Sequence, residues 1–259
     1  MNLHSTIAII PARGGSKELP GKNVRLLAGL PLIAHSIRFA RLCSEIERCI
    51  ISTDSEEIAK VARDAEGEVP FLRPLELAQD STPMLPVLQH AIRQMELLEE
   101  KRYQFVILLQ ATSPFRLPED VSRALQVMKQ DGVAVGVVAV SKPSFNPRVV
   151  CVEEMKGYLA WAFDRKTYTR RQDAEPVYRI NGMLYVWRRD HLMRSSVEQL
   201  YAAPHRILVI PEERALDIDS LYDFQVAEAL LESRILQLPW CNEDHSPILG
   251  HPERSRRAE

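Results

Sequence analysis

The chain has 259 residues, of which 46% are hydrophobic and 26% are charged, and its formal net charge is −2. These values are ordinary for a globular chain that buries a good core in one domain. The small net charge excludes a global field that would favour nucleic acid or an anionic membrane. No apolar run approaches the ~20 residues of a membrane span, and no signal peptide is visible. We therefore expect a cytoplasmic protein without nucleic-acid or membrane partners.

Strand-like and helix-like segments alternate along the first part of the chain. The apolar runs that predict strands cover residues 6–10, 48–52, 105–109 and 133–140. The segments that predict helices cover residues 32–42, 55–65, 83–98 and 118–129. Alternating units of this kind imply a mostly parallel sheet with helices on both faces. Ligands of such sheets bind outside the carboxyl ends of the strands, so one rim should carry the loops at residues 11–23, 53–54 and 110–116.

The pattern changes between about residues 141 and 190. Prolines, aromatic side chains and short alternating runs at residues 159–163 and 183–187 favour hairpins there, and we interpret the segment as an inserted β-rich arm. A core strand and an amphipathic helix follow, at residues 206–210 and 221–236. We therefore expect a single domain over residues 1–238 and a flexible tail over residues 239–259.

The loop after the first apolar run has the composition of a phosphate-binding segment. Residues 11–23 include three glycines, two lysines and one arginine. Glycine lets backbone N–H groups approach a ligand, and the cations supply the positive charge that a triphosphate requires. A P-loop is excluded, because Ser16 stands where its first glycine belongs and Asn23 stands where it needs Ser or Thr. A dinucleotide fingerprint is excluded, because Gly14 and Gly15 are adjacent.

The strand and loop at residues 7–23 resemble the start of the acylneuraminate cytidylyltransferase family, the CMP-sialic acid synthetases. That family begins with a strand followed by Pro-Ala-Arg-x-Gly-Ser-Lys-x-x-x-x-Lys-Asn. Further signatures of the family occur in its order up to about residue 231. The resemblance implies a Rossmann-like α/β nucleotidyltransferase fold with a mostly parallel sheet. It also implies a β-rich dimerisation arm, so we expect a homodimer.

The resemblance assigns the nucleotide half of the site. Arg13 and Lys22 would bind the phosphates and stabilise the charge on the departing pyrophosphate, and Asn23 would bind the nucleotide end. Arg73 stands in a segment similar to the family's Arg-Pro…Leu-Ala-x-Asp, whose arginine contacts the cytosine base. The expected nucleotide-binding residues are Ala12, Arg13, Gly14, Lys22, Asn23 and Arg73.

The resemblance also implies five sugar-binding residues: Gln110, Arg148, Arg171, Asn181 and Tyr185. The first of them follows a predicted strand in a segment similar to the family's Leu-Gln-x-Thr-Ser-Pro-x-Arg. Asn181 and Tyr185 stand in a segment similar to Asn-Gly-Ala-Ile-Tyr, and the two arginines align with cations near the sugar carboxylate. Thr112 and Ser113 could equally cap the helix expected after Pro118, so they are not assigned to the site.

Asp217 and Asp219 form the last constellation. In an extended segment, residues two apart point to the same side, and two neighbouring carboxylates repel each other unless a cation lies between them. Mg²⁺ suits such a site, because it favours carboxylate, water and phosphate oxygens, and Mn²⁺ is an alternative. Asp219 and Ser220 could also cap the following helix, and the two roles are compatible. The acylneuraminate cytidylyltransferase family, which this chain resembles, has Asp-Ile-Asp at this place and binds a metal ion with it.

The implied reaction transfers CMP from CTP to the anomeric hydroxyl of a sialic-acid-like nonulosonic acid, a nine-carbon sugar acid, and releases pyrophosphate. Acids of the N-acylneuraminate, legionaminate and pseudaminate types all fit. The expected catalytic residues are Arg13, Lys22 and Asp217. A related sugar nucleotidyltransferase, such as a CMP-Kdo synthetase, and a catalytically idle CTP-binding protein remain as alternatives. A hydride-transfer enzyme is disfavoured, since the dinucleotide fingerprint is missing.

Overall fold

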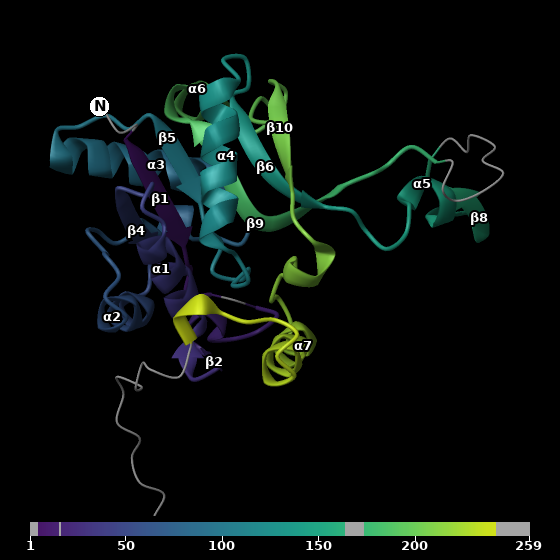
Figure 1. Ribbon diagram of the computed structural model, residues 1–259, viewed down its shortest axis with the longest axis horizontal. Helices are drawn as coiled ribbons and strands as arrows, with labels where there is room; N and C mark the ends of the chain where they lie inside the picture. Colours follow the sequence, from purple (N-terminus) through teal and green to yellow (C-terminus); the bar gives the residue numbers. More distant parts are fainter. Residues whose placement is uncertain (1–4, 16, 164–173, 242–259) are drawn as a thin grey trace, which may run out of the picture.

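A six-stranded sheet in the order β10-β6-β9-β5-β1-β4 forms the centre of the computed structural model, which describes residues 5–15, 17–163 and 174–241 (Figure 1). The strands are β1 (Thr6–Pro11), β4 (Arg48–Ser52), β5 (Phe105–Leu108), β6 (Gly136–Ser141), β9 (Arg179–Arg188) and β10 (His205–Val209). Strand β9 is antiparallel to its neighbours β5 and β6, and the other pairs are parallel. The prediction of a mostly parallel α/β sheet is therefore confirmed.

Helices cover both faces of this sheet. They are α1 (Leu32–Leu42), α2 (Glu56–Asp64), α3 (Met84–Glu99), α4 (Pro118–Gln130), α6 (Arg189–Arg194) and α7 (Leu221–Glu232), whereas the short α5 (Pro147–Val150) lies away from the sheet (Figure 1). Alternate residues of β1 point to opposite faces, so Ala8 and Ile10 pack with α1, α2, α4 and α7, whereas Ile7 and Ile9 pack with α3 and α6. Capping side chains mark where helices begin. At the start of α2, the Ser55 hydroxyl accepts a hydrogen bond from the N–H of Ile58 at 3.3 Å.

Strand β9 corrects one prediction. Residues 183–187 were expected in a hairpin of the arm, but they lie in the central sheet between β5 and β6. Met183, Leu184 and Val186 are fully buried there. The hairpin interpretation was wrong because a short apolar run does not reveal which strand it pairs with. The projecting segment therefore lies between β6 and β9.

The arm carries α5 and the hairpin of β7 (Val152–Met155) and β8 (Tyr158–Trp161). Figure 1 shows α5 and β8 far to one side of the central sheet. Large apolar side chains of the hairpin are exposed: Val152, Met155, Tyr158, Leu159 and Trp161. The arm thus leaves the body of the chain and presents an apolar surface.

The C-terminal segment of the described chain packs against the core. The sequence predicts a flexible tail from residue 239, but Trp240 is buried and its Nε1–H donates to His35 Nδ1 at 2.9 Å. Because Nδ1 accepts this bond, Nε2 carries the ring proton and donates to the carbonyl oxygen of Leu27 at 2.9 Å. The packed chain therefore extends to Cys241, and the rest of the predicted tail lies outside the described residues.

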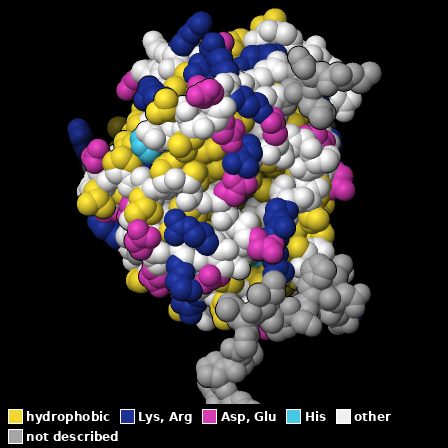
Figure 2. Space-filling model, turned by 90° about the vertical axis from the view of Figure 1, so that its left-hand side faces the viewer, with side chains coloured by type: hydrophobic (Ala, Val, Ile, Leu, Met, Phe, Trp, Pro, Cys, Tyr) yellow, Lys and Arg dark blue, Asp and Glu magenta, His cyan; other side chains and the backbone are white. Residues whose placement is uncertain are grey.

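The surface shows no large area of one charge on the face seen in Figure 2, where basic and acidic side chains intermingle with apolar ones. Within the described residues, no helix combines the length and apolar character that a membrane span needs. The four cysteines are free thiols. The mixture of basic and acidic side chains on this face agrees with the small net charge of the sequence (Figure 2).

Burial lowers the pKa of His35 to about 4, so the neutral ring is the form that the fold requires. Stability from this histidine is complete above its unfolded pKa of ~6.5 and is lost as the pH falls toward 4. We expect the free energy of unfolding to fall by about 2.5 kcal/mol more in wild type than in His35→Gln between pH 7.5 and pH 4.5. Urea unfolding at both pH values measures this difference, and equal losses in the two proteins would contradict the assignment.

Candidate active site

One cleft of about 270 Å³ collects most of the residues expected to bind nucleotide and metal, together with Gln110 of the expected sugar-binding residues. It is lined by Pro11, Ala12, Arg13, Lys22, Asn23, Arg73, Met84, Gln110, Ala111, Thr112, Asp217 and Asp219. A second cleft of about 400 Å³ shares Arg13, Lys22 and Asp219 with the first, so the two form one continuous groove. The groove lies at the carboxyl ends of β1 and β5, as the rule for parallel sheets predicts.

An ion pair between Lys22 and Asp219 joins two segments that line the groove. Lys22 Nζ lies 2.6 Å from Asp219 Oδ1, and only 13% of the lysine side chain is exposed. Gly21, with φ 67°, turns the chain before Lys22, and the left-handed conformation suits glycine. On the other side, Ser220 caps α7 in a capping box with Asp223, so the cap role also holds. The structure therefore brings the two distant segments together in one cleft.

The cations of the first loop already have carboxylate partners. Arg13 and Lys17 both form ion pairs with Asp80, which is 42% exposed. The Asn23 amide donates to the carbonyl oxygen of Arg13 at 3.2 Å, and the N–H of Gly14 donates to Asp54 Oδ1 at 3.2 Å. Exposed ion pairs of this kind contribute little stability, so a phosphate group can replace Asp80 at small cost.

Arg73 lines the same cleft. It is buried, and its Nη2 donates to Asp54 Oδ1 at 3.3 Å. Burial lowers the pKa of Arg73, and the charge of Asp54 opposes that shift. The Arg73 Nε–H is buried without a hydrogen-bond partner. A buried donor without a partner is costly, which fits a group reserved for a ligand.

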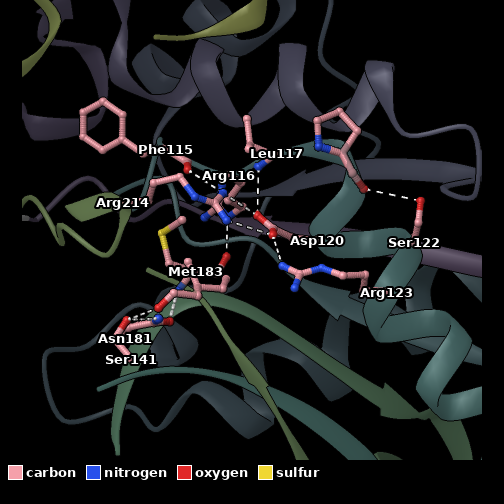
Figure 3. A network of polar contacts seen from close by, with 12 residues as sticks. Phe115, Arg116, Leu117, Asp120, Ser122, Arg123, Ser141, Asn181, Met183 and Arg214 are labelled. Atoms are coloured by element: carbon pink, nitrogen blue, oxygen red, sulfur yellow. Dashed lines mark hydrogen bonds and ion pairs between the residues drawn. The ribbon is translucent and has the colours of Figure 1, made fainter. Parts of the chain in front are cut away.

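A buried ion pair holds the segment that carries Asp217 and Asp219. Arg214 donates through Nη1 to Asp120 Oδ2 at 2.7 Å and through Nη2 to Oδ1 at 3.0 Å (Figure 3). On the opposite side, the Arg179 guanidinium donates to the Ala215 carbonyl oxygen at 3.0 Å. These contacts fix both flanks of the chain just before the acidic pair.

The environment of Asp217 fits a cation. Burial raises the pKa of Asp217, a hydrogen bond from Thr112 opposes the shift, and the charge of Asp219 adds to it. Asp217 Oδ1 is buried without a hydrogen-bond partner. Two carboxylates leave most of a Mg²⁺ shell to water and phosphate oxygens, as is usual for that ion. The described residues contain no cluster of three or more metal-binding side chains, so a site made entirely of protein ligands is not present among them.

The predicted sugar-binding residues are dispersed. Gln110 lines the cleft, and its Oε1 is buried without a partner. The Asn181 amide is already engaged, since Nδ2 donates to Ser141 Oγ at 2.9 Å and Oδ1 accepts the Met183 N–H at 3.2 Å (Figure 3). Tyr185 stacks on Trp187 within β9 and is not among the described residues that line the cleft.

The two predicted arginines do not join this cleft within the described chain. Arg148 lies on α5 in the arm, where its Nη1 is 2.7 Å from Glu175 Oε2. Arg171 lies outside the described residues. The sugar-binding roles of Asn181, Tyr185, Arg148 and Arg171 therefore stay predictions.

Sequence reasoning missed Thr112, which it left, together with Ser113, as a candidate cap of the helix after Pro118. They do not cap α4, because that helix starts after Leu117, whose N–H donates to Asp120 Oδ2 at 3.0 Å. Instead, Thr112 lines the cleft and its carbonyl oxygen accepts the N–H of Ile218 at 2.8 Å, between Asp217 and Asp219. The place of Thr112 directly after a buried strand was the signal that could have indicated a site role.

Arg116 was also missed, although it stands in the same motif. Its side chain is fully buried, and its guanidinium donates to Ser36 Oγ at 3.0 Å and to the carbonyl oxygen of Gln110. It also donates to the carbonyl oxygen of Met183 (Figure 3). It also lies over the Phe39 ring, 5.6 Å from the centroid. Burial lowers the pKa of Arg116 to about 9. This residue thus ties the end of β5 to β9 behind the cleft.

The fold and the paired cationic and acidic groups define an α/β protein of the nucleotidyltransferase type. A family model for cytidylyltransferases matches residues 7–236, so the chain belongs to the cytidylyltransferase family. It is 36% identical over 230 residues to the CMP-N,N'-diacetyllegionaminic acid synthase of Legionella pneumophila. The aligned region covers 87% of this chain and 96% of the relative.

Two further relatives carry different substrate names. The chain is 30% identical over 228 residues to a pseudaminic acid cytidylyltransferase of Campylobacter jejuni, covering 86% of this chain and 95% of the relative. It is 30% identical over 234 residues to an N-acylneuraminate cytidylyltransferase of Escherichia coli, covering 88% of this chain and 52% of the relative. The solved structure of CMP:2-keto-3-deoxy-manno-octonic acid synthetase complexed with CTP shares the fold, with a TM-score of 0.67 at 20% identity over 89% of this chain and 99% of that one.

The buried pair of Asp120 and Arg214 should stabilise the segment before the acidic pair. We expect Asp120→Asn to lower the free energy of unfolding by about 3 kcal/mol, because Arg214 loses its charged partner while the acceptor for the Leu117 N–H is kept. Arg123→Gln is the matched control: this half-exposed arginine contacts the same carboxylate and should cost less than about 1 kcal/mol. Similar losses in the two variants, measured by urea unfolding, would show that burial of the Arg214 pair is not the cause.

Proposed function

We propose that this protein transfers CMP from CTP to the anomeric hydroxyl of a nine-carbon sugar acid and releases pyrophosphate. The observation that carries the proposal is the cleft in which Arg13, Lys22 and Arg73 face Asp217 and Asp219. A nucleotide triphosphate needs both sets: cations for its phosphates, and carboxylates for the divalent cation that accompanies it. The names of the relatives supply the sugar class, since they include legionaminic, pseudaminic and N-acylneuraminic acids.

In the proposed reaction, the anomeric hydroxyl of the acid loses its proton to solvent and its oxygen forms a bond to the α-phosphorus. The bond from that phosphorus to the bridging oxygen of pyrophosphate breaks. Lys22 and Arg13 lie where they can neutralise the charge that develops on the departing pyrophosphate. Arg73, with its free Nε–H, binds the base end, and Gln110 binds the acceptor. Catalysis then consists mainly of positioning and charge stabilisation.

The proposed cofactor is Mg²⁺, with Mn²⁺ as a substitute, held by Asp217 and Asp219. When bound, it would offset the negative charge of the phosphate groups. In the free protein, the Asp219 carboxylate is 2.6 Å from Lys22 Nζ, so CTP binding would separate the pair. Lys22 would then contact a phosphate group of CTP, and the Asp219 carboxylate would contact the cation.

An assay of pyrophosphate release tests this proposal. We expect wild type to consume CTP in the presence of Mg²⁺ and at least one of N-acetylneuraminic, legionaminic and pseudaminic acid. Kdo and UTP serve as the competing acceptor and the competing nucleotide. CTP binding without turnover of any acid would instead indicate the idle binding protein, and a preference for Kdo would indicate the eight-carbon enzyme.

We also propose that two copies form a homodimer through the arm, and that the enzyme works in the cytoplasm, where CTP is supplied. The apolar side chains of the β7–β8 hairpin are exposed in the single chain, and a second copy would bury them. Arg148 lies on α5, which projects to one side of the central sheet with the rest of the arm (Figure 1). A two-fold arrangement would let this arginine approach the sugar site of the partner.

Leu159→Glu should disrupt that dimer, because it places a charge in the exposed apolar surface of the arm. Leu97→Glu is the matched control, since Leu97 is an equally exposed leucine at the end of α3. Light scattering coupled to size exclusion should show a dimer for wild type and the control, and a monomer for Leu159→Glu. A monomeric wild type, or a dimer in all three proteins, would contradict the proposal.

A further inference from the structure

The Asp54 carboxylate joins two segments beside the cleft through a single oxygen atom. Its Oδ1 accepts a hydrogen bond from the N–H of Gly14 at 3.2 Å and another from Arg73 Nη2 at 3.3 Å. Gly14 belongs to the loop after β1, and Arg73 follows α2 in the chain. Arg73 lines the cleft, whereas Asp54 is not among the described residues that line it. Asp54 can therefore influence a ligand of the cleft through these two partners.

The main chain brings these segments together, and the Asp54 side chain then sets the position of the arginine head group. The N–H of Arg73 donates to the carbonyl oxygen of Thr53 at 2.7 Å, so the backbone of the arginine lies beside that of Asp54. A Cβ built on Gly14 would lie 3.1 Å from Ser55 Cβ, so the loop packs closely on this segment. An arginine side chain has many rotamers, and a charged hydrogen bond to a carboxylate selects among them.

The buried pair of Asp54 and Arg73 differs from the other ion pairs at the cleft. Among the described residues, the cations that line the cleft each have a carboxylate partner: Arg13 has Asp80, Lys22 has Asp219, and Arg73 has Asp54. The side chains of Asp80 and Asp219 are 42% and 53% exposed, but those of Asp54 and Arg73 are only 15% and 4% exposed. An exposed pair exchanges its carboxylate for a phosphate at small cost. Removing the carboxylate from a buried arginine instead leaves an uncompensated charge.

We infer that Asp54 is a positioning residue of the nucleotide site, which holds the Arg73 guanidinium in place for the base and stays paired with it when CTP binds. The inference rests on the proposed function, in which Arg73 binds the base end of CTP. Because Asp54 accepts from Nη2, the buried Nε–H of Arg73 is left for the ligand. The bond to Gly14 also fixes the place of the phosphate loop relative to this guanidinium.

Two substitutions of aspartate by asparagine test the inference, because they change the charge equally and should affect CTP binding differently. Each removes one negative charge near the triphosphate, and charge alone would strengthen CTP binding in both. We expect Asp54→Asn to weaken CTP binding at least ~10-fold, since the buried Arg73 loses its charged partner. Asp80→Asn should bind CTP as tightly as wild type or more tightly, because it removes a carboxylate that competes with the phosphates. Calorimetric titration of CTP with Mg²⁺ into the three proteins measures both effects.

A double variant tests whether Asp54 acts through Arg73. Arg73→Gln removes the guanidinium, so adding Asp54→Asn to it should change CTP affinity by less than about twofold. The asparagine side chain keeps an oxygen that can accept the Gly14 N–H, and the double variant contains neither charge of the buried pair. It therefore avoids the buried, unpaired charge that could prevent Asp54→Asn from folding.

Glu96→Gln is the matched control for the loss of a buried ion pair. Glu96 is 15% exposed, as Asp54 is, and its carboxylate binds the guanidinium of Arg189 outside the lining of the cleft. This variant should melt at a lower temperature than wild type but bind CTP with wild-type affinity. Asp54→Asn should keep KM for the sugar acid within about twofold of wild type, because the inference concerns the nucleotide alone.

Wild-type affinity for CTP in Asp54→Asn would overturn the inference, as would a double variant in which the effects of the two single substitutions multiply. Weaker CTP binding in Glu96→Gln would also overturn it, because loss of stability would then explain the result. Wild-type turnover decides the proposed function separately, so a wild type that consumes CTP keeps that function even if Asp54 has no role. If wild type binds no CTP, the proposed function fails and the role of Asp54 fails with it.

Discussion

The ion pair between Lys22 and Asp219 is the contact on which the site depends, because it joins the loop after the first strand to the segment before the last helix. The two atoms lie 2.6 Å apart although the residues are 197 positions apart in the chain. The pair assembles opposite charges in the absence of substrate, so nucleotide binding needs only an exchange of partners. Electrostatic groups that are already in place spare reorganisation during the reaction.

Three polar atoms of the residues that line the cleft are buried without hydrogen-bond partners: Arg73 Nε, Gln110 Oε1 and Asp217 Oδ1. By contrast, the contacts behind them are complete: Arg116 uses three acceptors, and Arg214 binds both oxygens of Asp120. The unpaired polar atoms of the cleft lower stability, and the complete hydrogen bonds of the residues behind them hold the cleft in place.

The sequence predicted the parallel strands and the phosphate loop well, because both depend on local pattern: buried apolar runs, glycines and capping residues. It failed for β9, whose apolar run does not specify a partner strand, and for Trp240, whose burial depends on the distant His35. Within the site, the charged motifs of the sequence were enough to predict Lys22 and Asp219, which both line the cleft. The role of Arg116 could not be predicted, because only the folded structure shows that its guanidinium binds the carbonyl oxygens of Gln110 and Met183.

Calorimetric titration of CTP with Mg²⁺ into wild type, Lys22→Ala and Lys60→Ala tests the central claim most directly. Lys60 pairs with Asp64 on the exposed face of α2, so its loss controls for the removal of one positive charge. The account predicts that Lys22→Ala weakens CTP binding at least ~10-fold, the effect of losing one charge-assisted bond, while Lys60→Ala binds as wild type does. Equal affinities for wild type and Lys22→Ala would contradict it.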